Sequence, residues 1–212
     1  METQKVPVSV YAEMTPNPGV LKFVANKRLI EVDSVEFKNI EEAQVSPLAT
    51  RLFHFPFIKE IFISGNYLAI SKFDIVEWEE VTMELRELIR DFLAEGNTAV
   101  HEHLLQASSE EEESSQVSAQ APQAHPEETP KEKWDAIDEK IASLLDEYVK
   151  PAVESDGGNI KFLSHNEGVV SVLLQGACSG CPSSTATLKG GIENMLQQMM
   201  PGQIKAVVAV NG

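Results

Sequence analysis

Apolar residues in the first half of the chain recur with strand-like spacing in several short stretches. Val6–Glu13 alternates enough to predict a strand, and Leu21–Ala25 predicts a second, followed by an extended piece at Leu29–Val32. Two β-rich runs, Ile58–Ser64 and Tyr67–Phe73, are separated by two turn-forming residues and are typical of a hairpin. The pattern therefore predicts a small sheet in this half.

Helical spacing also occurs twice in the first half of the chain. Ser46 can cap a short helix that has Pro47 at its first position. Trp78–Glu95 is expected to form a longer helix, because its apolar residues fall on one stripe. That stripe comprises Val81, Leu85, Leu88, Ile89 and Phe92. Together with the predicted sheet, the two helices favour one small α+β domain over residues 1–105.

Residues 106–133 differ from the rest of the chain in composition. Glu, Ser, Gln, Ala and Pro dominate this stretch, and large apolar side chains are nearly absent. Its seven acidic residues against two lysines leave a net charge of −5. Such a segment cannot bury enough apolar surface to offset its chain entropy, so we predict a flexible, disordered acidic linker.

An ordered pattern returns over residues 134–212. Trp134–Val149 has apolar residues at helical spacing, and Pro151 is expected to kink or end that helix. Ile160–Leu163 and Val169–Leu174 predict two strands joined as a hairpin. The second half therefore begins with one helix and one hairpin.

A second helix and a last strand complete this half. Thr185–Met199 is expected to be helical, and Pro201 with Gly202 stops the helix before a strand at Ile204–Val210. The residues expected on its inner face are Leu188, Ile192, Met195, Leu196 and Met199. The predicted order is α-β-β-α-β. The whole chain is thus predicted to be α+β, with two small α/β domains joined by the linker.

The charge of the chain excludes some classes of partner. Its 212 residues carry a formal net charge of −16, which nucleic-acid phosphates and anionic membrane surfaces would repel. No run of apolar residues is long enough for a membrane span. The N-terminal stretch METQKVPVSVYAEM looks like neither a secretory signal nor a transit peptide, so we expect a cytoplasmic protein.

The chain has two cysteines, Cys178 and Cys181, within the stretch QGACSGCPSSTATL. Two residues separate them, so one tight turn can direct both sulfur atoms at one point. Gly176 and Gly180 allow close approach to a ligand, and Pro182 suits the first position of a following helix. The positive end of that helix dipole favours the thiolate form, which binds soft metals or attacks disulfides. The surrounding Gly, Pro and Ser residues favour an exposed loop over a buried, inert pair.

Two thiolates do not complete a metal site. Structural zinc and the common iron–sulfur clusters usually have four protein ligands, and this chain offers two sulfurs. The pair therefore acts as a dithiol redox centre, or a second copy or an external thiol supplies the remaining ligands. No histidine is assigned a role, and His101 and His103, which flank Glu102, are interpreted as a solvated pair.

Two longer stretches around the cysteines match a known pattern. Asp156–Ile160 reads DGGNI and Leu174–Ser184 reads LQGACSGCPSS, with further matches in Thr187–Lys189 and Gly191–Glu193. On these residues the second half closely resembles the NifU C-terminal domain of Nfu-type iron–sulfur scaffold and carrier proteins. A bare C-x-x-C motif says little, whereas this combination is hard to reach by chance.

The first half carries a second resemblance. Its matching stretches are Thr15–Pro18, Leu21–Val24, Glu41–Ala43 and Ser46–Ala49. On these residues it resembles the Nfu N-terminal domain. With both halves accounted for, only the linker lies outside the resemblance.

The resemblance implies a scaffold or carrier for iron–sulfur clusters and not an enzyme. Members of this family hold a labile cluster, commonly [4Fe–4S] and alternatively [2Fe–2S], at the interface of two subunits. Here Cys178 and Cys181 would be the ligands from each subunit, which implies a homodimer through the C-terminal domain when the cluster is loaded. The expected partners are apo iron–sulfur client proteins and upstream cluster-assembly proteins.

A thiol–disulfide oxidoreductase is the alternative function. A C-x-x-C pair near β and α elements is its usual signature. Against it, Pro182 follows the second cysteine and does not lie between the two. The predicted element order also lacks a clear parallel βαβ crossover. Binding of one zinc per dimer, without iron, would indicate a third option, a structural zinc site.

Overall fold

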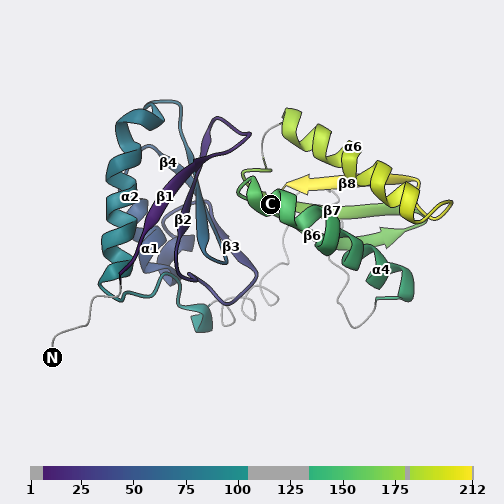
Figure 1. Cartoon of the computed structure of the whole chain (residues 1–212), viewed down its shortest axis with the longest axis horizontal. Coiled ribbons are helices and arrows are strands. Elements are labelled where there is room, and N and C mark those ends of the chain that lie inside the picture. Colours follow the sequence, from purple (N-terminus) through teal and green to yellow (C-terminus); the bar gives the residue numbers. More distant parts are fainter. Residues whose placement is uncertain (1–6, 105–133, 180–181, 212) are drawn as a thin grey trace, which may run out of the picture. The chain divides into compact units, whose positions relative to one another are not determined.

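A computed structural model describes residues 7–104, 134–179 and 182–211 of the chain. The chain divides into two units, residues 1–121 and 122–212, which are described separately (Figure 1). The predicted linker, residues 106–133, lies outside the described residues. Both units combine a sheet with helices, which confirms the α+β class.

The first unit contains a five-stranded antiparallel sheet with the strand order β1-β2-β5-β4-β3. Its strands are β1 Val10–Met14, β2 Val20–Ala25, β3 Ser34–Phe37, β4 Ile58–Ser64 and β5 Tyr67–Lys72. The predicted hairpin is confirmed, because Ser64 pairs with Tyr67 across a turn in which Gly65 has φ of 50°. Glycine adopts such a positive φ without the steric cost that most other residues bear.

The edges of this sheet differ from the sequence prediction. The first strand begins at Val10, whereas the alternation predicted a start at Val6, which lies outside the described residues. Leu29–Val32, predicted as an extended piece, is not part of the sheet, and the backbone N–H groups of its first two residues donate to the Gly65 carbonyl, at 2.7 and 3.4 Å. The strand follows at Ser34–Phe37, where the alternation of polar and apolar residues is only four positions long.

Two α-helices of the first unit, α1 Pro47–Leu52 and α2 Trp78–Ala94, pack on the sheet, preceded by the short 3-10 helix η1 Glu42–Val45. Figure 1 shows α1 and α2 together on one side of the strands. The predicted apolar stripe of α2 is confirmed for its fully buried members Leu85 and Ile89. The carboxylates of Glu77 and Glu80 form a capping box at the N-terminus of α2.

Ser46 links α1 to a distant part of the same unit. Its Oγ accepts a hydrogen bond from the Ala49 backbone N at 3.1 Å and donates one to the Ala99 carbonyl at 2.7 Å. We expect Ser46→Ala to lower the free energy of unfolding by about 2 kcal/mol, because a helix cap is lost and a buried carbonyl loses its donor. Urea unfolding measures this loss. Ser9→Ala, at an exposed position, is the control and should stay within about 0.5 kcal/mol of wild type; an equal loss in both variants would contradict the capping role.

The second unit has a three-stranded sheet in the order β6-β7-β8. β6 Gly158–Asn166 and β7 Val169–Gly176 form the predicted hairpin, with positive φ at Glu167 and Gly168 (51° and 87°), as a two-residue type I′ turn requires. β8 Ala206–Asn211 pairs parallel to β7 and is reached through the helix α6 Pro182–Met199. The expectation that a parallel βαβ crossover is lacking was therefore wrong. Apolar spacing locates a strand but does not say which neighbour it pairs with.

The first helix of the second unit is longer than predicted and changes its winding. α4 Ala136–Leu144 passes into a π-helical turn, η3 Leu145–Val149, and then into α5 Lys150–Ser155. Pro151 was expected to kink or end the helix, but it lies in the first turn of α5, where a missing backbone N–H costs least. The π turn, in which the Lys150 N–H donates to the Leu145 carbonyl, changes the register just before the proline.

The core of the second unit lies between these helices and one face of the sheet. Ile192 and Leu196 of α6 are buried as predicted. Met199, predicted on the same inner face, is 40% exposed, and the neighbouring Met200 is 1% exposed instead. The helix ends at Met199, so the next side chain no longer follows the helical spacing. Among the described residues, no helix is long and apolar enough to cross a bilayer.

Candidate functional site

The described cysteine, Cys178, lies in the short turn between β7 and α6. The backbone N–H of Ala177 donates to the Gly157 carbonyl at 3.2 Å, and that of Ser179 donates to the Gly176 carbonyl at 3.0 Å. Gly176 has φ of 63°, which confirms the predicted need for glycine at this position. The turn is thereby bonded to the residue directly before β6 as well as to the end of β7.

The predicted partner ligand, Cys181, and the adjacent Gly180 lie outside the described residues. α6 begins directly after them at Pro182, the position predicted for the first helical residue. The Oγ1 of Thr185 donates to the Cys178 carbonyl at 3.2 Å, so the cysteine turn is bonded to the first turn of α6. Cys178 therefore lies at the strand-to-helix corner that the sequence predicts.

Gly158 lets the start of β6 approach the cysteine closely. A Cβ atom added at this glycine would lie 2.8 Å from the Cys178 Sγ and 2.7 Å from the Gln175 carbonyl oxygen. Both distances are too short for a real side chain. Gly157 of the same DGG motif has the positive φ (83°) of a chain turn, so the two glycines of the motif serve different purposes.

Cys178 is more buried than the loop composition suggests. The residue is 7% exposed and belongs to the apolar core of the second unit. Burial raises the pKa of the Cys178 thiol from 9.0 to about 11, and the negative charge of Asp156 adds to the rise. The expectation of an exposed thiolate was wrong for Cys178, because loss of solvation outweighs the favourable dipole of the nearby helix start.

A buried neutral thiol suits some chemistry better than other chemistry. The thiolate is the attacking form in disulfide exchange, so a pKa of about 11 makes Cys178 a poor nucleophile near neutral pH. A bound metal cation, in contrast, compensates the thiolate charge directly and displaces the proton. The environment of Cys178 therefore favours metal ligation over redox exchange.

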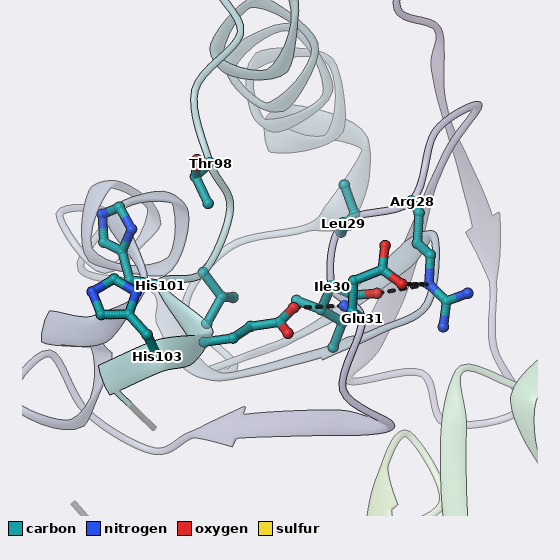
Figure 2. Close-up of a pocket in the computed structure, with 9 residues that line it drawn as sticks. Arg28, Leu29, Ile30, Glu31, Thr98, His101 and His103 are labelled. Atoms are coloured by element: carbon teal, nitrogen blue, oxygen red, sulfur yellow. Dashed lines mark hydrogen bonds and ion pairs between the residues drawn. The ribbon is translucent and has the colours of Figure 1, made fainter. Parts of the chain in front are cut away.

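The histidines within the described residues do not add a metal centre. No group of three or more His, Cys, Asp or Glu side chains in the described parts of the chain is arranged to hold a metal ion. His101 and His103 lie with their ring centroids 5.7 Å apart at the side of a surface hollow (Figure 2). His165, which like the other histidines is assigned no role from the sequence, has its Nδ1 3.7 Å from Oδ1 of Asp138 on α4. Local sequence gave no signal of that pair, since its members lie on different elements.

Both halves of the chain match known domain families. The family described as "Scaffold protein Nfu/NifU N terminal" matches residues 10–96, and the family described as "NifU-like domain" matches residues 141–208. These ranges fall within the predicted domains 1–105 and 134–212, whose ends remain predictions.

Relatives named as iron–sulfur cluster scaffold or NifU-like proteins are similar over most of the chain. The "NFU1 iron-sulfur cluster scaffold homolog, mitochondrial" of Drosophila willistoni is 33% identical over 193 residues, which cover 91% of this chain and 60% of the relative. The human protein of the same name is 32% identical over 91% of this chain and 68% of its own length. The "NifU-like protein 4, mitochondrial" of Arabidopsis thaliana is 31% identical over 96% of this chain and 66% of its own length.

The names of these relatives contradict the predicted location. All three are called mitochondrial, whereas the sequence analysis expected a cytoplasmic protein from its N-terminal residues. Targeting segments are separate from folded domains, so the composition of residues 1–14 does not determine the compartment.

The family itself follows from three agreeing observations. The two domain families occur in the expected order, the human relative is similar over two thirds of its length, and the cysteine turn lies at the strand-to-helix corner. The chain belongs to the Nfu-type family of iron–sulfur cluster scaffold proteins.

Proposed function

We propose that two copies of this chain hold one iron–sulfur cluster between them and pass it to apo-proteins. Cys178 and Cys181 of each copy are the proposed ligands, although only Cys178 belongs to the described residues. The observation that carries the proposal is the buried Cys178 thiol on a turn kept clear by Gly158. Two of the relatives are themselves named as iron–sulfur cluster scaffold proteins, which supports the proposal.

The number of sulfurs supports sharing between two copies. One chain has two cysteines, and a cluster of either common type usually takes four thiolate ligands. Two copies supply four without any other donor. We favour a [4Fe–4S] cluster, with [2Fe–2S] as the alternative, and a homodimer formed through residues 134–212 when the cluster is loaded.

The chemistry of Cys178 supports transfer and not permanent storage. When a bond between iron and Cys178 breaks, a thiol with a pKa of about 11 takes up a proton at neutral pH. This protonation favours release, because the free thiol no longer competes for the metal. Thiolates of a client could then replace the four ligands one at a time. The proposed partners are therefore apo iron–sulfur clients and the assembly proteins that supply the cluster.

The oxidoreductase alternative is not favoured. The parallel crossover from β7 through α6 to β8 removes one sequence argument against it. The raised pKa of Cys178 supplies a stronger one, because disulfide exchange needs thiolate near neutral pH. Pro182 also begins α6 after the second cysteine, as the sequence predicts.

Anaerobic reconstitution of the full chain with ferrous iron and sulfide tests the proposal. We expect a brown dimer with about two irons per chain, since one [4Fe–4S] cluster serves two copies; about one iron per chain would indicate [2Fe–2S]. Cys178→Ser should lose both colour and dimer. Size-exclusion chromatography with iron and sulfide analysis, before and after chelation, measures the oligomeric state, the iron content and the sulfide content.

Two outcomes would contradict the bridging model. One is a loaded monomer with four irons, which needs two external ligands. The other is a colourless protein that instead binds one zinc per dimer or reduces insulin.

A further inference from the structure

Three hollows on the surface of the first unit adjoin one another. One of about 490 Å³ lies along α2 beside the end of α1, and one of about 450 Å³ lies beside the segment that follows α2. A third, of about 360 Å³, shares Phe92 with the first and Thr98 and His101 with the second. We call these three neighbouring hollows together the α2 groove.

The part of the groove along α2 combines an acidic rim with apolar side chains. Its carboxylates recur on one helical face: Glu80, Glu84, Glu87, Asp91 and Glu95. The cation among its lining residues is Arg51, at the end of α1. Leu88 and Phe92 provide apolar surface, and Met83 is 57% exposed to solvent. An exposed methionine in an acidic hollow is a typical adaptable contact for a partner side chain.

Much of this negative charge is not compensated within the unit. Asp91 pairs with Arg90 at 2.9 Å, and Glu80 belongs to the capping box. The carboxylates of Glu84 and Glu87, in the centre of the rim, form no hydrogen bond or ion pair with a described residue. Two uncompensated carboxylates therefore lie beside the most exposed apolar side chain of the groove.

The charged residues at the other end of the groove do not offset the negative charge along α2. Figure 2 shows His101 and His103 at one side of the hollow and Glu31 and Arg28 across from them. Arg28 is already engaged, because its Nε donates to the Ile30 carbonyl at 2.8 Å and lies 3.5 Å from the Glu31 carboxylate. The carboxylate of Glu102 accepts a hydrogen bond from the Glu31 backbone N.

We propose that the α2 groove docks a basic segment of another protein, whose Lys and Arg side chains meet the rim and whose apolar side chains contact Met83, Leu88 and Phe92. Charge decides between the possible occupants. Residues 106–133 of this chain carry seven acids and two lysines, and a second copy carries a net charge of −16, so the groove repels both. A foreign segment with the opposite charge is the occupant that the groove attracts.

This surface is independent of cluster ligation. It lies wholly in the first unit, and both cysteines lie in the second. A variant of the groove should therefore keep its iron content and its colour. Failure of cluster binding and failure of groove docking can be measured separately on the same protein.

The test uses the full chain and a synthetic 16-residue helical peptide of lysine and leucine, with leucines on one face. Wild type should bind this peptide, with amide NMR shifts concentrated on α2 and residues 98–103. Glu84→Lys with Glu87→Lys should weaken binding about tenfold or more, because both rim charges are reversed. Glu41→Lys with Asp74→Lys makes the same change in net charge at exposed positions outside the groove. That control should stay within about twofold of wild type.

Three results would overturn the proposal. The first is that wild type does not bind the peptide. The second is an equal loss of affinity in the groove variant and the control variant, which would show that net charge alone attracts the peptide. The third is self-association of the metal-free wild type that the groove variant abolishes, which makes a second copy the occupant. Met83→Ser tests the apolar contact: it should weaken peptide binding without changing the net charge, and an unchanged affinity would contradict that contact.

Discussion

Gly158→Ala should abolish cluster loading while a matched glycine variant leaves it intact. The added Cβ would lie 2.8 Å from the Cys178 Sγ and 2.7 Å from a backbone carbonyl oxygen, so either the cysteine turn or the start of β6 must move. Overpacking of this kind costs about 1–3 kcal/mol of unfolding free energy. Iron and sulfide content after anaerobic reconstitution measures the loading, and thermal unfolding measures the stability.

Gly190→Ala is the matched control for that experiment. This glycine lies within α6, and a Cβ added there meets nothing within 4 Å. Alanine in a helix interior is favoured over glycine by about 0.5–1 kcal/mol, so this variant should be more stable and should load normally. Normal loading of Gly158→Ala would show that the position of Cys178 does not depend on this close approach.

The stability of the metal-free protein should fall as the pH rises from about 9 to about 11. The folded state raises the pKa of Cys178 to about 11, so folded chains hold this proton more tightly than unfolded chains do. The resulting stabilisation is fully present below the pKa of the unfolded thiol and is lost as the pH passes the folded value. A shift of two pKa units corresponds to about 2–3 kcal/mol.

Urea unfolding under reducing conditions at a series of pH values measures this dependence. Cys178→Ser serves as the control, because its remaining titrating groups are those of wild type. The wild-type curve should fall more steeply than the control curve across this window. Parallel curves would mean that the Cys178 thiol ionises alike in folded and unfolded chains.

Local signals made much of the fold predictable. The hairpin of β4 and β5 has a Gly-Asn turn between two β-rich runs, and Ser46-Pro47 marks the start of α1. α2 and α6 have apolar residues at helical spacing. In each case the determining residues are close together in the sequence, so a pattern of a few positions is enough.

Long-range packing decided the features that could not be predicted. The parallel pairing of β8 with β7 depends on how α6 folds back over the sheet. The burial of Cys178 depends on contacts with β6, whose start approaches it through Gly158. The loop composition suggested exposure, but loops next to a sheet can still direct one side chain into its core.

The pairing of β8 with β7 has a consequence for synthesis of the chain. β8 ends at Asn211, and it closes the crossover in which Cys178 lies. Parallel pairing across a helix forms late, because the intervening segment must first be ordered. Until residues 206–211 have left the ribosome, the turn that holds Cys178 lacks this support. A growing polypeptide therefore orders the surroundings of this cysteine only after the strand that follows α6 has been released and has paired with β7.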